Sequence, residues 1–175
     1  GRLLHPAGRG GLAFHLMDNA ALCSELATAL VAKGWMMATA ESCTGGLIAA
    51  SCTDLAGSSN WFERGFVTYS NAAKRDLLGI RQCTLDAYGA VSEEIAQEMA
   101  EGALARSAAR IAVAVTGIAG PGGSEHKPEG RVCFGLARAG QPVRTETVDF
   151  GPLGRAAVRK ATVEHALKLL AESLA

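Results

Sequence analysis

The stretch that decides the fold reads Trp35-Met-Met-Ala-Thr-Ala40, then Glu41-Ser-Cys-Thr-Gly-Gly46, then Leu47-Ile-Ala-Ala-Ser-Cys52. An apolar run that breaks into hydroxyl and glycine residues and resumes as small residues predicts a buried strand, a turn and a helix. A helix start offers unpaired backbone N–H groups and the positive end of the helix dipole to an anion. The hydroxyls of Ser42 and Thr44 can cap the helix, bind phosphate or attack a carbonyl. A plain helix cap with glycines for packing remains the alternative, since short glycine-bearing motifs have low specificity.

The rest of the chain alternates between helix and strand patterns. Helices are predicted at 19–33 after an Asp18 cap, from Asn71 (its cap) to about Gly79, at 93–107 after a Ser92 cap, and at 155–173. Strands are predicted at 62–69, broken by Gly65, at 111–115, and in a hairpin formed by 132–137 and 143–148. A loop of fourteen residues with several glycines, 116–129, follows the 111–115 strand, and loops of this length are commonly functional.

This alternation predicts an α/β fold, a layered α/β/α domain with a mixed, partly parallel sheet. Three polar or glycine-rich segments directly follow strands, namely 41–46, 69–74 and 116–123. Ligands of such sheets bind beyond the carboxyl ends of the strands. If the three strands are parallel, we expect these segments to meet at one edge and form a site.

Length and composition limit the function classes. With 175 residues, we expect a single domain over 18–175, preceded by a flexible leader or expression remnant at 1–17. Seventeen basic residues balance seventeen acidic ones, which argues against a nucleic-acid binder and gives no support to binding at an anionic membrane.

The cysteines and histidines indicate a reducing compartment and no metal. Five cysteines are scattered without CxxC spacing, so neither a disulfide framework nor a zinc ribbon is expected, and the cytoplasm is the predicted location. The four histidines do not pair at metal-ligand spacing. We therefore expect neither a metal nor a cofactor.

The residues at the predicted edge favour nucleophilic chemistry without a histidine. A serine can be activated by a lysine whose pKa burial has lowered, and Lys74 has a suitable position near a helix start. Tyr69 could donate to an oxyanion or relay a proton. Arg155 and Arg159 lie one turn apart where the helix dipole disfavours cations, which hints at anion binding. For each residue the ordinary alternative is a solvated or packed side chain.

Several motifs, in order, resemble the CinA C-terminal domain family, whose characterised members are nicotinamide mononucleotide (NMN) amidohydrolases. The resemblance covers roughly residues 20–174. It rests on the segments Ala40–Gly46, Gly57-Ser-Ser-Asn-Trp-Phe-Glu-Arg-Gly-Phe-Val-Thr-Tyr-Ser-Asn71 with Lys74, Gly89-Ala-Val-Ser-Glu93, and Thr116-Gly-Ile-Ala-Gly-Pro-Gly-Gly123.

The resemblance implies hydrolysis of the NMN carboxamide to nicotinate mononucleotide and ammonia, a step of pyridine nucleotide recycling. It also implies a Ser/Lys pair, in which Lys74 is the base and either Ser59 or Ser42 the nucleophile. We favour Ser59, because the glycine turn after Ser42 suits a phosphate, and expect Tyr69 to support the chemistry. The NMN substrate is expected to contact Thr44, Gly45, Gly46, Thr116, Gly117 and Arg155.

The chain departs from the family's usual sequence near the end of the long loop. Where the family often shows Lys-Pro-Val-Gly-Thr-Val, this chain has Lys127-Pro-Glu-Gly-Arg-Val132, so it differs at Glu129 and Arg131. Two functions are alternatives to NMN hydrolysis. One is that of a catalytically silent protein-interaction module linked to competence or the DNA damage response, and the other is that of an amidase for another small molecule. We expect a homo-oligomer that binds neither nucleic acid nor membrane.

Overall fold

The computed structural model describes the backbone of residues 9–175, with side chains from residue 19 onward. Residues 1–8 of the predicted leader, and the side chains of the rest of it, lie outside the described residues. The helix predicted to begin after an Asp18 cap begins instead at Arg9, so Asp18 lies inside a helix and does not cap it. A run of helix-forming residues from Leu12 to Met17 allows the helix to extend through the predicted boundary.

The order of elements follows the predicted alternation closely. The helices are α1 (Arg9–Lys33), α2 (Leu47–Thr53), α3 (Asn71–Leu78), α4 (Gln82–Tyr88), α5 (Glu93–Ala105) and α6 (Arg155–Leu174), with a 3₁₀ turn η1 at Ser58–Asn60. The strands are β1 (Met37–Glu41), β2 (Phe62–Val67), β3 (Ile111–Gly117), β4 (Arg131–Arg138) and β5 (Arg144–Asp149).

The five strands form one mixed sheet in the order β2-β1-β3-β4-β5. β1 pairs in parallel with both β2 and β3, whereas β4 pairs antiparallel with β3 and β5. The predicted mixed sheet and hairpin are therefore confirmed. Because β1, β2 and β3 run in the same direction, the segments that follow them do meet at one edge of the sheet.

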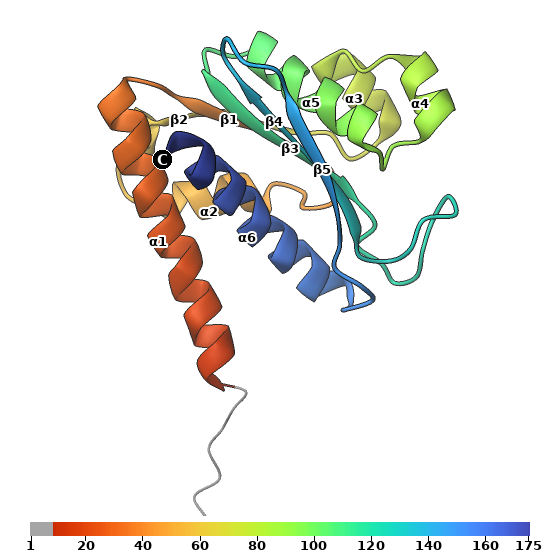
Figure 1. Ribbon diagram of the computed structural model, residues 1–175, viewed down its shortest axis with the longest axis horizontal. Coiled ribbons are helices and arrows are strands. Elements are labelled where there is room, and N and C mark those ends of the chain that lie inside the picture. Colours follow the sequence, from red (N-terminus) through yellow and green to blue (C-terminus); the bar gives the residue numbers. More distant parts are fainter. Residues whose placement is uncertain (1–8) are drawn as a thin grey trace, which may run out of the picture.

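Helices cover both faces of the sheet (Figure 1). The two faces differ in residue size. On the side of α1, α2 and α6, the sheet contributes large side chains, including Ile111, Val113 and Phe134. On the side of α3, α4 and α5, it contributes mainly alanines from β1, β3 and β4. A Cβ on Gly135 of β4 would lie 2.4 Å from the Ala96 carbonyl oxygen, so α5 packs close to the sheet only because this residue is glycine.

Two local predictions were wrong, and one short helix was not predicted. Ser70, not Asn71, caps α3, since its Oγ accepts a hydrogen bond from the Ala73 N–H at 3.0 Å. Gly65 does not break β2, which continues through it. A Cβ there would lie 2.7 Å from Thr39 Oγ1, so this glycine permits close strand packing. The helix that was not predicted is α4.

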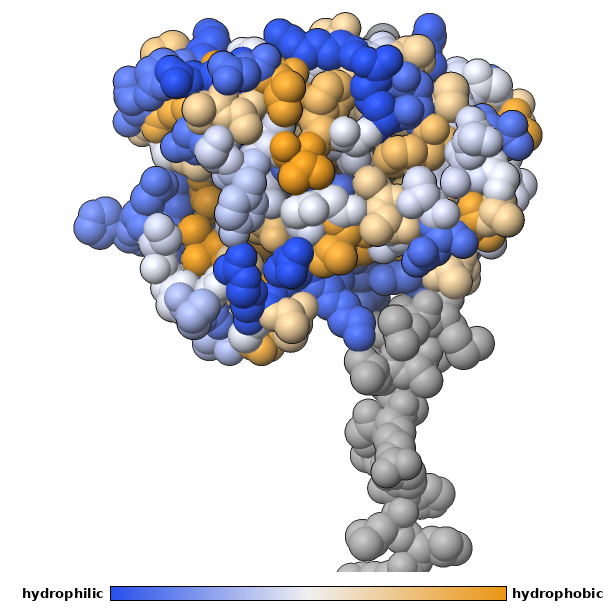
Figure 2. Space-filling view, turned by 180° about the vertical axis from the view of Figure 1, so that it is seen from behind, coloured by the Kyte–Doolittle hydropathy of each residue, from blue (hydrophilic) through white to orange (hydrophobic). Residues whose placement is uncertain are grey.

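The surface of the described residues carries scattered apolar side chains. Figure 2 shows them interspersed with polar residues on the face seen from behind. Across residues 9–175, no helix has both the length and the apolar character needed to cross a membrane.

Candidate active site

The turn that follows β1 carries Ser42 at the carboxyl edge of the parallel strands. Its backbone N–H donates to the Val115 carbonyl at 3.1 Å, which attaches the turn to β3. The side chain is 8% exposed and lines a cavity. Ser42 is therefore held at a fixed place on the cavity wall, and only a small part of its surface remains open to a ligand.

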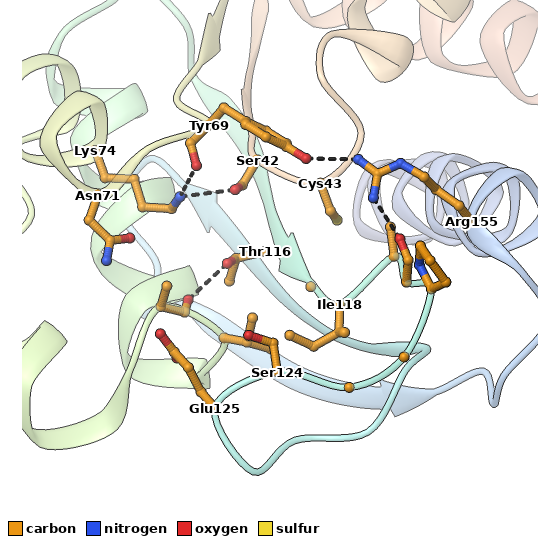
Figure 3. Close-up of a pocket in the computed structure, with 18 residues that line it drawn as sticks. Ser42, Cys43, Tyr69, Asn71, Lys74, Thr116, Ile118, Ser124, Glu125 and Arg155 are labelled. Carbon is orange, nitrogen blue, oxygen red and sulfur yellow. Dashed lines mark hydrogen bonds between the residues drawn. The ribbon is translucent and has the colours of Figure 1, made fainter.

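Lys74 reaches this serine from α3, the helix that follows β2. Its side chain is 1% exposed, and its Nζ donates to Ser42 Oγ at 2.9 Å. The same nitrogen donates to the backbone carbonyl of Tyr69 at 3.3 Å (Figure 3) and to that of Thr68 at 2.9 Å. No carboxylate neutralises Lys74 among the described side chains, so three neutral oxygens hold it in place.

Burial changes the acid–base properties of two side chains at this site, Lys74 and Cys43. It lowers the pKa of Lys74 from 10.5 to about 8, because a buried ammonium loses its hydration. Burial likewise raises the pKa of the neighbouring Cys43 thiol to about 12, so that thiol stays protonated and is a weak nucleophile. The lysine is therefore the group at this site that can exchange a proton near neutral pH.

The cavity has a volume of about 310 Å³ and extends from Ser42 and Lys74 to the glycine-rich loop after β3. Of the described residues that line it, two have cationic side chains, Lys74 and Arg155. Arg155 donates to the Tyr69 hydroxyl at 2.8 Å and to the Gly120 carbonyl at 2.7 Å (Figure 3). Within residues 19–175, no cluster of three or more His, Cys, Asp or Glu side chains could hold a metal ion.

The start of α2 is not an open anion site, contrary to the sequence-based expectation. The Glu41 carboxylate occupies it, accepting the N–H groups of Ile48 at 2.9 Å and Ala49 at 3.0 Å. The Thr44 hydroxyl donates to the same carboxylate at 2.5 Å. Gly46, the residue before α2, has no side chain with which to cap the helix, and the strand residue Glu41 supplies the missing acceptors.

Arg159 fixes the turn from the other side. Its Nε donates to the Cys43 carbonyl at 3.1 Å, and its Nη2 donates to the Thr44 carbonyl at 3.2 Å. The residue suspected of anion binding thus uses its guanidinium to bind backbone oxygens. In this way α6 holds the turn that presents Ser42.

The structure brings together about half of the residues predicted for the site. The cavity is lined by Ser42, Tyr69, Lys74, Thr116, Gly117 and Arg155. Thr44, Gly45 and Gly46 do not line it, because Thr44 is buried against Glu41 and the two glycines turn the chain away into α2. The Thr116 hydroxyl donates to the Ala90 carbonyl at 2.8 Å, so its proton is already committed.

Ser59 lies far from Lys74. It is exposed in η1, which precedes β2, whereas Ser42 follows β1. Since β1 and β2 are parallel, the two serines sit at opposite edges of the sheet. The five residues of β1 separate these edges by roughly 16 Å. The preference for Ser59 rested on a phosphate bound at the turn after Ser42, and that reason is removed because Glu41 occupies the start of α2.

Four polar residues of the cavity wall were not predicted as site residues: Cys43, Asn71, Ser124 and Glu125. Asn71 was interpreted as a helix cap, although its place one residue after Ser70, at the same sheet edge as Ser42, could have indicated a site residue. Ser124 and Glu125 lie in the long loop, and nothing in their sequence pattern indicates that they turn back to the cavity.

Comparisons with known proteins relate nearly the whole described chain to one family. The family model of the CinA C-terminal domain matches residues 19–174. The nicotinamide-nucleotide amidohydrolase PncC of Enterobacter agglomerans is 58% identical over 130 residues, which cover 74% of this chain and 79% of that protein. PncC of Escherichia coli K12 is 50% identical over 151 residues, 85% of this chain and 90% of that protein.

A solved structure is also closely similar. The competence/damage-inducible protein of Agrobacterium tumefaciens superposes with a TM-score of 0.86 at 49% sequence identity, covering 90% of this chain and 95% of that one. The resemblance noted in the motifs is thus confirmed along nearly the whole described chain. This protein belongs to the CinA C-terminal domain family.

Proposed function

We propose that this chain hydrolyses the carboxamide of NMN to nicotinate mononucleotide and ammonia, with Ser42 as nucleophile and Lys74 as general base. The observation that carries the proposal is the 2.9 Å contact between Lys74 Nζ and Ser42 Oγ on the wall of the cavity. The names of the PncC relatives support the substrate. Burying a lysine against a serine costs folding free energy. A catalytic site gives a reason for that cost, whereas a catalytically silent interaction module gives none.

The three partners of Lys74 dictate how it would act once deprotonated. A neutral lysine has two N–H donors and one lone pair, and the carbonyls of Thr68 and Tyr69 can only accept. Those two carbonyls therefore take the two N–H groups, and the lone pair faces the Ser42 hydroxyl, which can donate. Loss of one proton from the ammonium thus converts a donor to Ser42 into a base aimed at it.

The proposed reaction proceeds through an acyl-enzyme. Ser42 Oγ attacks the carboxamide carbon while Lys74 takes the hydroxyl proton. The tetrahedral intermediate then collapses, the lysine gives that proton to the leaving nitrogen, and ammonia departs. Water attacks the resulting ester with Lys74 again as base, and Lys74 returns the proton it gains to Ser42 Oγ. The carboxylic acid formed in this way loses its proton to solvent and leaves as nicotinate mononucleotide.

Recognition of the 5′-phosphate is assigned in this proposal to Arg155. Its guanidinium lines the cavity and forms no ion pair with any described side chain, because its two recorded partners are a phenol and a carbonyl oxygen. A phosphate is a stronger acceptor than either. The N-terminus of α2 is occupied by Glu41, so it is not offered as the phosphate site.

The remaining expectations stay predictions. Tyr69 supports catalysis by holding Arg155, and Thr116 and Gly117 form the wall beneath the substrate ring. The reaction needs no metal or cofactor, serves pyridine nucleotide recycling, and takes place in the cytoplasm in a homo-oligomer.

An ammonia-release assay tests the proposal directly. NMN, nicotinamide riboside and nicotinamide are compared, and NMN is expected to give at least about a hundredfold higher kcat/KM than the riboside, from one phosphate–guanidinium contact and its orienting effect. Release of ammonia from nicotinamide riboside as fast as from NMN would refute phosphate recognition. If neither NMN nor nicotinamide riboside releases ammonia while a different amide is hydrolysed, the assignment of NMN as the substrate is refuted.

A further inference from the structure

The carboxylate of Glu129 joins two segments that are distant in the sequence. Its Oε1 accepts the Gly122 N–H at 2.6 Å, in the glycine-rich loop that lines the cavity. Its Oε2 accepts the Gly154 N–H at 3.2 Å, in the residue directly before α6. One side chain therefore fixes the loop after β3 relative to the start of the last helix.

Both segments determine where the Arg155 guanidinium lies. Arg155 is the first residue of α6 and follows Gly154, one of the two residues that Glu129 holds. Its guanidinium donates to the Gly120 carbonyl in the same loop. A Cβ on Gly120 would lie 2.4 Å from Glu129 Oε1, so the carboxylate packs directly against the loop where Arg155 binds.

Glu129 also offsets the backbone cost of the two glycines that it holds. Gly122 and Gly154 have φ angles of 76° and 93°, conformations that glycine adopts at low steric cost but with a large loss of backbone freedom. A charge-assisted hydrogen bond to each N–H offsets that loss. Glu129 is half-buried and does not line the cavity, so it does not touch a ligand there and acts on one through its neighbours or through its charge.

We propose that Glu129 is a positioning residue that pre-organises Arg155 and the Gly120–Gly123 loop for the phosphate of the substrate. The inference rests on the proposed function, in which Arg155 binds that phosphate. Glu129 is also one of the two positions where this chain departs from the Lys-Pro-Val-Gly-Thr-Val pattern, and a valine there offers no acceptor to either N–H group. Pre-organisation acts on binding, so the effect belongs in KM and not in kcat.

Steady-state kinetics of Glu129→Val and Glu129→Gln test this with two substrates. For NMN, Glu129→Val is expected to raise KM about tenfold with kcat within about twofold, since two charge-assisted bonds are lost. Glu129→Gln keeps an oxygen for one N–H group, so its KM should lie between those of wild type and Glu129→Val. For nicotinamide riboside, which lacks the phosphate, kcat/KM should not change. Glu172→Val, an exposed site near the end of α6, is the matched control.

A double-mutant cycle distinguishes positioning from general disruption. In an Arg155→Leu background, Glu129→Val should change the KM for NMN by less than about twofold, because the residue it positions is gone. An equal effect in both backgrounds, an equal loss of kcat for both substrates, or a lower KM for NMN in Glu129→Val would each overturn the inference. The last result would mean that the carboxylate acts mainly by repelling the phosphate.

Calorimetric titration with NMN separates this inference from the proposed function. If wild type binds NMN about ten times more tightly than Glu129→Val but releases no ammonia, the deamidase proposal fails and the positioning role stands. If the two proteins bind NMN equally, the positioning role fails whatever the enzymatic activity.

Discussion

Two turns of this molecule combine serine with glycine at a strand end, and they differ in their surroundings. Ser42 follows β1, is 8% exposed and lies 2.9 Å from Lys74 Nζ. Ser59 precedes β2, is exposed and lies at the opposite edge of the sheet. The comparison teaches that the direction of the strand, more than the local motif, decides whether such a serine meets a base. At the carboxyl edge of parallel strands several connecting segments converge.

Replacing each serine by alanine gives the largest expected difference. Ser42→Ala should lower kcat for NMN by about a thousandfold or more, because it removes the nucleophile. Ser59→Ala should keep kcat and KM within about twofold. The measurement is ammonia release, with circular dichroism to verify that both variants fold. A dead Ser59→Ala beside an active Ser42→Ala would reverse the assignment.

Lys74→Arg should also remove most of the turnover, by about a hundredfold or more, since arginine keeps its proton at any usable pH. In wild type, kcat/KM should rise about tenfold per pH unit up to about pH 8, the lowered pKa of Lys74, and level off above it. The pH profile of NMN hydrolysis measures this. A flat profile from pH 6 to 9, or a Lys74→Arg enzyme of normal rate, would exclude a lysine base.

The same buried lysine should make stability depend on pH. The folded-state pKa of about 8 lies below the ordinary 10.5, so between these values the unfolded chain holds a proton that the folded chain has lost. The contribution of Lys74 to the free energy of unfolding is therefore lowest below pH 8 and rises as the pH increases to 10.5. At 1.36 kcal/mol per pH unit, the gap corresponds to about 3 kcal/mol.

Chemical denaturation of wild type and Lys74→Met measures this effect. From pH 7 to pH 10.5, the free energy of unfolding of wild type should gain about 3 kcal/mol relative to the variant. Ser59→Ala, at the other edge, should follow wild type across the whole range. A constant difference between wild type and Lys74→Met would mean that burial does not lower the pKa of Lys74.

The smallest expected effect concerns the support of the Ser42 turn. Glu41→Gln replaces one acceptor oxygen at the start of α2 by an amide donor and should lower the free energy of unfolding by about 1–3 kcal/mol. Ser59→Ala should stay within about 0.5 kcal/mol, as exposed substitutions usually do. Thermal and urea denaturation provide the comparison, and a Glu41→Gln protein as stable as wild type would contradict the capping role.

Much of the fold could be predicted because its signals are local. Periodicity and turn residues located the strands, and the short hairpin loop at 139–141 indicated that β4 and β5 pair directly. The helix start at Arg9 was missed because Asp18 satisfies a cap pattern inside a longer helix-forming run. Ser70 and Asn71 both suit an N-cap, and only the backbone geometry distinguishes them.

The site was harder to predict, because its contacts join residues that are distant in the sequence. The sequence indicated Lys74 and two candidate serines, but knowing which serine lies beside the lysine required the strand directions. The occupation of the α2 start by Glu41 was also missed. A glycine before a helix leaves N–H groups without a side-chain cap, and that deficit could have directed attention to the glutamate at the end of β1.

The Glu41 carboxylate fills the start of α2. A side chain of the protein thus takes the place that a ligand's phosphate takes at helix starts in other α/β folds. Ser42 and Lys74 come from β1 and α3, whereas Arg155 and its supporting loop come from segments beyond β3. Under the proposed roles, bond cleavage and substrate recognition then lie in separate parts of the sequence. Changes in a loop and one helix start would alter which amide is recognised and leave the Ser42–Lys74 pair in place.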